Sequence, residues 1–210
     1  MKKKYIKAGI IAVLLIAVSF NLWKNRGGCV VTIDQNLNSS KVSFFYQKDG
    51  RWKDEELGES RYTIGSSGCI ITCLASICSV NDMNNDSILN VNPSTLNQYL
   101  REQAVYDHDG NIQWDELQKA LGVTVIRENT SEVNSDILSE YIRSGKYPIV
   151  RVHMPITGKN HYVLLIGSQN GSFLCMDPLS RTNEPVSLKK YGNKIYAVRT
   201  IMVSVDNYSK

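Results

Sequence analysis

The sequence predicts an α+β fold in which helices come first and an antiparallel sheet follows. Segments with apolar residues at helical spacing lie mostly between residues 69 and 145, whereas β-rich segments fill residues 147–205. The segment that begins at Cys69 is apolar on all sides, which is typical of a buried helix. We therefore expect the C-terminal sheet to pack against this helix.

The helices are placed by the spacing of their apolar residues and by residues that favour helix ends. The Cys69 helix is expected to begin after a cap in Ser66-Ser67-Gly68 and to end near Asn81. A second helix is expected to start at Pro93, because proline is favoured in the first helical turn. In total we expect two or three helices within residues 82–122 and one more at residues 135–145.

Short runs rich in β-branched and aromatic residues predict the strands. Two of these runs are joined by a short turn that contains glycine, so they should pair as a hairpin. The hairpin strands are expected at residues 161–169 and 171–179, and the other strands at 123–128, 147–154 and 194–205.

Composition and charge narrow the class of protein. The chain has 210 residues, of which 42% are hydrophobic and 21% are charged, so disordered and collagen-like architectures are excluded and one globular domain is expected. The net charge of +4 is misleading, because residues 1–26 hold six of the 24 Lys and Arg residues and no acidic residue. The remaining 18 basic and 20 acidic residues give −2, which argues against a nucleic-acid partner.

The first 26 residues predict a membrane-targeting segment, either a signal anchor or a cleavable signal peptide. A basic start precedes an apolar run of 16 residues, 8–23, and basic residues follow it. If the helix at residues 6–23 is retained, it anchors the protein in the cell membrane with the domain outside the cytoplasm. If Ala17-Val18-Ser19 is a cleavage site, the protein is secreted. Polar residues 27–41 then predict a tether or a wrapping segment, and residues 42–210 the domain.

Cys69 is the candidate nucleophile. It opens the predicted buried helix directly after two serines and a glycine, and the positive end of a helix dipole favours a thiolate there. Cys73 and Cys78 lie within the same helix and Cys175 lies within a strand, so we expect them in the core.

His161 and Asp177 are the candidate base and its orienting carboxylate. They lie 16 positions apart around a turn centred near Gln169 and Asn170, so both side chains are expected at the same end of the hairpin. A carboxylate there would fix the tautomer of the imidazole and stabilise its cation. We expect His108 to lie in a solvated turn and His153 to have a packing or edge role. A cysteine at a helix start with a distant His and Asp is the arrangement of papain-type peptidases.

Several motifs in combination resemble cysteine peptidase family thirty-nine, the papain-superfamily group of bacteriocin-leader peptidases and their stand-alone exported relatives. The motifs are FYQKDGRWKDEELGE, YTIGSSGCIITCLA, KNHYVLLIG and LCMDPL, and the resemblance covers residues 42–205. It implies Cys69 as nucleophile, His161 as general base and acid, and Asp177 as the residue that orients the imidazole. It also implies Gln47 as a side-chain donor of the oxyanion hole.

The sequence departs from this family at positions next to the implied catalytic residues. Asn160 replaces a glycine that usually precedes the histidine, and Ile70 and Ile71 replace a Gly-Pro pair that often follows the cysteine. None of these changes removes a catalytic group, but they bear on substrate specificity. The chain has no transporter or ATPase segment, so processing coupled to export does not follow from the resemblance.

Residues 107–111 resemble part of a calcium loop, but the template would place Val105 at its first ligand position. A turn that caps the following helix is the better interpretation, and whether Asp107 or Asp109 binds an ion stays open. We expect no metal or organic cofactor.

The sequence thus predicts an exported thiol peptidase with a papain-like fold that acts on a peptide or protein substrate. Two alternatives remain open: an amidase or endopeptidase of the same superfamily that cleaves cell-wall peptides, and a non-catalytic binding domain that retains the fold.

Overall fold

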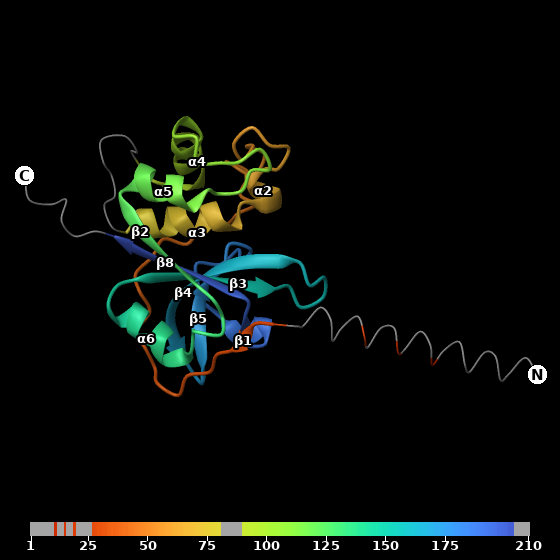
Figure 1. Ribbon diagram of the computed structural model, residues 1–210, viewed down its shortest axis with the longest axis vertical. Helices are drawn as coiled ribbons and strands as arrows, with labels where there is room; N and C mark the ends of the chain where they lie inside the picture. Colours follow the sequence, from red (N-terminus) through yellow and green to blue (C-terminus); the bar gives the residue numbers. More distant parts are fainter. Residues whose placement is uncertain (1–10, 12–14, 16–18, 20–26, 81–89, 204–210) are drawn as a thin grey trace, which may run out of the picture.

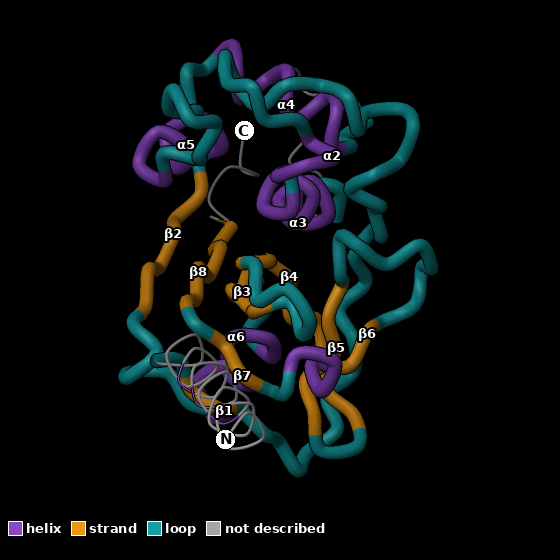
Figure 2. Tube along the Cα trace, turned by 90° about the vertical axis from the view of Figure 1, so that its right-hand side faces the viewer, coloured by secondary structure: helices purple, strands orange, loops and turns teal. Residues whose placement is uncertain are grey.

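The computed structural model describes residues 27–80 and 90–203, together with the isolated residues 11, 15 and 19. It has three layers, with a six-stranded antiparallel sheet in the middle (Figures 1 and 2). Four helices, α2 to α5, cover one face of the sheet, and α6 lies on the other face with a two-stranded ribbon. The prediction of an α+β fold with helices before the sheet is confirmed.

The helix that begins at Cys69 is α3 (Cys69–Cys78), and all of its residues from Ile71 onward are buried, as its composition predicted. The predicted cap is confirmed at Gly68, which is the N-cap residue of α3, but neither serine caps this helix. Ser66 and Ser67 belong to a separate short helix, α2 (Ile64–Ser67), which is capped by Thr63, and Gly68 joins the two helices. Only Gly68 separates α2 from α3, and its φ and ψ angles of −83° and 23° depart from those of an α-helix.

The other helices follow the predicted positions closely. Helix α4 (Pro93–Glu102) begins with proline in its first turn and is capped by the side chain of Asn92. Helix α5 (Trp114–Leu121) ends at Gly122, and α6 (Ser135–Arg143) is capped by Asn134. The first residues predicted to follow the Cys69 helix, 81–89, lie outside the described residues.

The main sheet has the strand order β2-β8-β3-β4-β5-β6, and every neighbouring pair is antiparallel. The predicted strand at residues 194–205 is divided at Tyr196 into two strands that belong to different sheets. The strands are β1 (Cys29–Val30), β2 (Val123–Glu128), β3 (Tyr147–His153), β4 (Asn160–Gln169), β5 (Ser172–Met176), β6 (Val186–Ser187), β7 (Lys194–Ile195) and β8 (Ala197–Val203).

The hairpin of β4 and β5 turns at Asn170 and Gly171, one residue beyond the predicted centre near Gln169 and Asn170. Both turn residues have positive φ angles, 53° and 77°, which is typical of a tight Asn-Gly turn. The register also shifts between Leu165 and Gly167, and Leu164 pairs with Met176 at the end of the ladder. His161 and Asp177 are therefore diagonal neighbours at this end of the hairpin and not direct partners.

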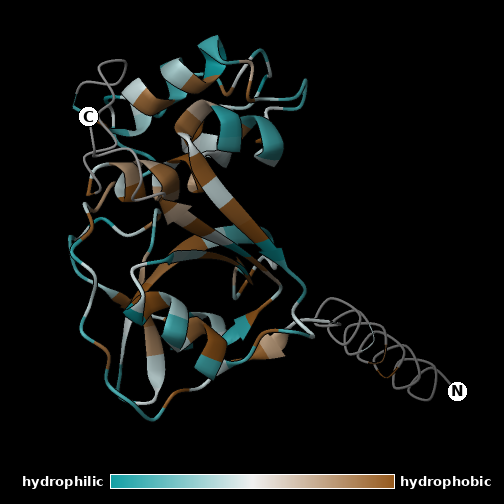
Figure 3. Ribbon diagram, turned by 60° about the vertical axis from the view of Figure 1, so that its left-hand side comes forward, coloured by the Kyte–Doolittle hydropathy of each residue, from teal (hydrophilic) through white to brown (hydrophobic). Residues whose placement is uncertain are grey.

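The sheet separates two hydrophobic cores. On one face, Ile149, Leu164 and Ile201 pack with the buried side of α3. On the other face, Val150, Leu165 and Phe173 pack with α6. Figure 3 shows apolar strand positions enclosed by helices whose outer faces are polar. Burial of both sheet faces holds the ends of β4 and β5 in fixed positions relative to α3.

The segment predicted as a tether or wrap, residues 27–41, lies against the domain. Val31 and Ile33 are buried in the core beside α6. The backbone of residues 37–40 forms hydrogen bonds with the part of β4 that follows Leu164, the last β4 residue paired with β3. The predicted anchor, residues 6–23, lies outside the described residues except for three isolated positions. No helix in the described ranges has the length and apolar character needed to cross a membrane.

Gly68 is predicted to be required for the junction before Cys69. In Gly68→Ala the new Cβ would lie 2.6 Å from the carbonyl oxygen of Ile64 and 2.7 Å from its Cα atom. We expect the free energy of unfolding, measured by urea denaturation, to fall by roughly 1–3 kcal/mol. Gly50→Ala is the matched control, because its Cβ would meet no atom within 4 Å. Equal stability of the two variants would contradict the tight junction.

Candidate functional site

The start of helix α3 presents Cys69 at the surface of the domain. Its side chain is partly exposed, whereas Cys73, Cys78 and Cys175 are buried in the core as the sequence predicted. The Cys69 Sγ atom lies 4.0 Å from the carbonyl oxygen of Ser67. Position and exposure therefore distinguish Cys69 from the other cysteines of the hydrophobic helix and sheet.

His161 and Asp177 form a buried pair at the end of the β4–β5 hairpin. His161 Nε2 lies 2.8 Å from Asp177 Oδ1, and the exposed fractions of the two side chains are 4% and 0%. The two side chains meet across a diagonal of the hairpin, a separation that long side chains can span. The predicted approach of these residues is thus seen in the structure, although their catalytic roles stay predictions.

With Nε2 directed at Asp177, Nδ1 is the ring nitrogen left for Cys69. Burial disfavours the imidazolium and is the largest single influence on the pKa of His161. The hydrogen bonds and charges of Asp177 and Cys69 outweigh it and raise this pKa to about 9. His161 is therefore coupled on one side to a carboxylate and on the other to the sulfur.

The Asp177 carboxylate has four hydrogen-bond donors. Oδ1 accepts from His161 and from the backbone N–H of Leu179 at 2.9 Å. Oδ2 accepts from Lys190 Nζ and from the Tyr191 hydroxyl, each at 2.7 Å. Burial acts most strongly and would raise the pKa of Asp177, but the hydrogen bonds from His161 and Lys190 hold it well below its usual range.

Lys190 and Tyr191 were not predicted as site residues. They come from the short 3₁₀-helix η1 (Leu188–Tyr191), which follows β6 and packs against β5. Burial, and next the charge of Asp177, raise the pKa of Tyr191, so its hydroxyl remains a donor. The local sequence Lys-Lys-Tyr carries no motif, and only the folded chain brings η1 to the carboxylate.

Gln47 is buried close to the same site. Its backbone N–H donates to the carbonyl oxygen of Pro178 at 2.8 Å, and its side-chain Nε2 donates to Gly65 at 3.2 Å. The bond to Gly65 fixes which end of the amide is the donor, and it uses one of two N–H groups. Oε1 is buried and has no hydrogen-bond partner among the described residues. Gln47, which only the family resemblance marked in the sequence, is thus held between Pro178 and the segment before Cys69.

The remaining candidates have local roles. The His153 ring stacks on Tyr196 with centroids 3.6 Å apart, which agrees with the predicted packing role, and His108 is exposed. Asp107 accepts hydrogen bonds from the backbone of Asp109 and Asn111, as in a turn. Across the described ranges, no three His, Cys, Asp or Glu side chains are grouped as metal ligands would be.

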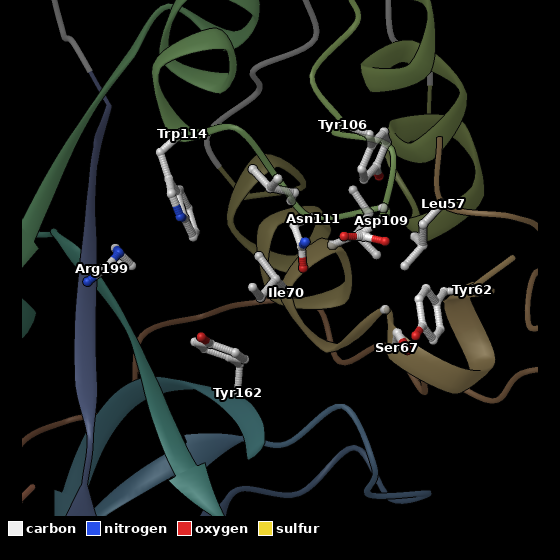
Figure 4. Close-up of a pocket in the computed structure, with 14 residues that line it drawn as sticks. Leu57, Tyr62, Ser67, Ile70, Tyr106, Asp109, Asn111, Trp114, Tyr162 and Arg199 are labelled. Carbon is white, nitrogen blue, oxygen red and sulfur yellow. The ribbon is translucent and has the colours of Figure 1, made fainter. Parts of the chain in front are cut away.

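A cavity of about 490 Å³ opens beside the start of α3 (Figure 4). Ser67, Gly68 and Ile70 line it, so it lies directly next to Cys69 along the chain. Its walls are rich in aromatic residues. Cys69 itself does not line the cavity, so a ligand there would contact the residues that flank Cys69 in the chain.

Lys190 is predicted to lower the basicity of His161 through Asp177. In Lys190→Met the carboxylate loses a cation, so it stabilises the imidazolium more strongly. We expect the imidazole to titrate roughly half a pH unit higher, as measured by NMR of the ring nitrogens. Lys189→Met is the matched control, because Lys189 Nζ bonds to the carbonyl of Asn170 and not to Asp177. An unchanged or lower imidazole pKa in Lys190→Met would contradict this.

The pair also predicts how stability depends on pH. Because folding raises the pKa of His161 from 6.5 to about 9, its contribution is complete below pH 6.5 and is lost as pH rises through about 9. We expect the stability difference between the parent and His161→Gln to shrink by roughly 1–3 kcal/mol between pH 6 and pH 9.5. Urea denaturation at both pH values measures it. A difference that does not change with pH would contradict a charged pair.

Comparisons with known proteins find a structural likeness but no match in sequence. No protein-family model matches the chain, and no curated protein matches its sequence. Among solved structures, one similar chain is described as a "putative C39-like peptidase" from Bacillus anthracis. It is 14% identical with a TM-score of 0.44, and the match covers 79% of this chain and 100% of that chain. A likeness of this degree carries no argument about the activity of this chain.

Proposed function

We propose that the chain is a papain-type cysteine peptidase in which Cys69, His161 and Asp177 act together. The observation that carries the proposal is the buried hydrogen bond of 2.8 Å between His161 and Asp177, with Cys69 coupled to the same imidazole. A nucleophile, a base and a group that orients the base are the parts that covalent catalysis by a thiol requires. Structural residues alone have no need of this combination.

The proposed reaction begins when the Cys69 thiolate attacks the carbonyl carbon of a peptide bond. The imidazolium of His161 then gives its proton to the leaving nitrogen, so the C–N bond breaks, the amine departs and a thioester remains. In the second half, His161 takes a proton from water, whose oxygen attacks the thioester. The carboxylic acid leaves, and the thiolate and imidazolium are restored. Asp177 keeps the imidazole in position throughout.

Gln47 is proposed to stabilise the oxyanion of the tetrahedral intermediates together with the backbone N–H of Cys69. The bond from Nε2 to Gly65 leaves the second N–H of the amide for this purpose and stops the amide from flipping. Loss of one such donor typically costs on the order of 3 kcal/mol in the transition state. The same residues would serve an enzyme that cleaves cell-wall peptides, so this chemistry does not select the substrate.

We further propose that the domain works outside the cytoplasm, anchored through residues 6–23 or released after cleavage. The basic start and the apolar run of the sequence support this.

Labelling with a thiol-directed electrophile at pH 6 tests the proposed function. We expect rapid modification of Cys69, and at least a tenfold slower reaction in His161→Ala, because the thiolate loses its imidazolium partner. Cys29→Ala is the matched control, since Cys29 is the other partly exposed cysteine. Equal and slow labelling of Cys29 and Cys69 would contradict the proposal and favour a binding domain.

Hydrolysis of a peptide library provides the second measurement. We expect cleavage that is lost on Cys69→Ala and reduced roughly a thousandfold or more in His161→Ala. Purified cell-wall fragments run in parallel separate the two enzyme hypotheses. Cleavage that persists in Cys69→Ala would rule out this nucleophile.

A further inference from the structure

The cavity beside Cys69 has one end that is positively charged. Figure 4 shows Trp114, Arg199 and Tyr162 gathered on one side, Tyr62 and Ser67 on the other, and Ile70 between them. The lining combines aromatic and aliphatic side chains, which suit an apolar group, with the polar side chains of Ser67, Asp109 and Asn111. The charged end needs a separate explanation, because a partly buried guanidinium is costly unless it has a partner.

Arg199 projects from β8 and is half-buried. Its guanidinium lies 5.9 Å from the centre of the Trp114 ring, and NH1 donates to the carbonyl oxygen of Val198 at 2.7 Å. None of the ion pairs within the described part of the chain involves Arg199. A planar guanidinium with donors left over is suited to a carboxylate, which it binds through two parallel hydrogen bonds.

The neighbouring strands add more positive charge to this end. Arg127 of β2 is the direct cross-strand partner of Arg199, and Arg151 of β3 lies two residues beyond its other partner, Ile149. All three arginines therefore share the sheet face that α3 covers. Arg127 is paired with Asp115, whereas Arg151 donates to the carbonyl oxygen of Tyr196 and takes part in no described ion pair. Like charges on adjacent strands repel one another, and an anion would relieve that repulsion.

The cavity extends from this charge to the chain segment that contains Cys69. The same cavity is lined by Arg199 and by Ser67, Gly68 and Ile70, and Gly68 and Ile70 are the residues on either side of Cys69. A peptide bond placed at Cys69 therefore directs a neighbouring substrate residue into the cavity. A carboxylate on that residue would reach a guanidinium that has no acidic partner in the described part of the chain.

We propose that this cavity selects substrates with an acidic side chain close to the scissile bond, and that Arg199 binds its carboxylate. Apolar parts of the same substrate segment pack on Trp114 and Tyr162. The inference rests on the proposed peptidase function, because it assigns the substrate class of that site.

The test compares peptides that are identical except for Glu, Gln or Lys at each position near the cleaved bond. At one position we expect kcat/KM for the Glu peptide to exceed that for the Gln peptide by about tenfold or more. In Arg199→Gln this ratio should fall close to one. Arg199→Lys should keep part of the preference, since it retains the charge without the planar fork.

Arg127→Gln is the matched control, because Arg127 lies on the same sheet face but is already paired with Asp115 and does not line the cavity. It should keep the Glu preference. A preference for Glu that survives in Arg199→Gln, or its absence in the parent protein, would overturn the inference while Cys69-dependent cleavage still supports the peptidase.

Calorimetric binding of the same peptides to Cys69→Ala tests the cavity assignment independently of the proposed peptidase activity. Tighter binding of the Glu peptide that depends on Arg199 supports the cavity assignment even if the parent protein hydrolyses nothing. In that case the proposed peptidase function would be contradicted, and the assignment of the cavity would stand. Equal binding of the Glu and Gln peptides would count against the role of Arg199.

Discussion

The buried carboxylate of Asp177 is the constraint around which the site is built. A charge without solvent contact is unfavourable unless hydrogen bonds satisfy it, and here four donors converge on its two oxygens. These donors come from β4, from the segment after β5 and from η1. Because the carboxylate requires all three segments in place, it fixes the His161 ring relative to the sheet. The orientation of the imidazole is thus a property of the whole hairpin end.

The same end of the hairpin also fixes the other side of the site. Pro178, the residue after Asp177, accepts a hydrogen bond from the backbone of Gln47, and the Gln47 side chain bonds to Gly65 in α2. Helix α2 leads through Gly68 directly to Cys69. A continuous set of hydrogen bonds and one covalent junction therefore connects the carboxylate to the nucleophile. This connection explains how residues from four distant parts of the sequence keep a common geometry.

Much of this arrangement could be predicted from the sequence, because it depends on local patterns. Apolar spacing placed α3, α6 and β2, and the two-strand pattern around a glycine turn predicted the hairpin that carries His161 and Asp177. The details that failed depend on backbone geometry. The Asn170-Gly171 turn and the shift near Gly167 moved the register, and the serines before Cys69 formed a helix of their own. Lys190, Tyr191 and Arg199 could not be found, since their partners come from other elements and no local motif marks them.

The hydrogen bond between His161 and Asp177 is the central claim, and proton NMR tests it most directly. A ring N–H held by a buried carboxylate is strongly deshielded, so the folded protein is expected to show a downfield His161 Nε2–H resonance. It should disappear in His161→Gln and move upfield in Asp177→Asn, where a neutral amide replaces the charge. The absence of this resonance from the folded protein at pH 6, or a resonance that Asp177→Asn leaves unchanged, would contradict the account.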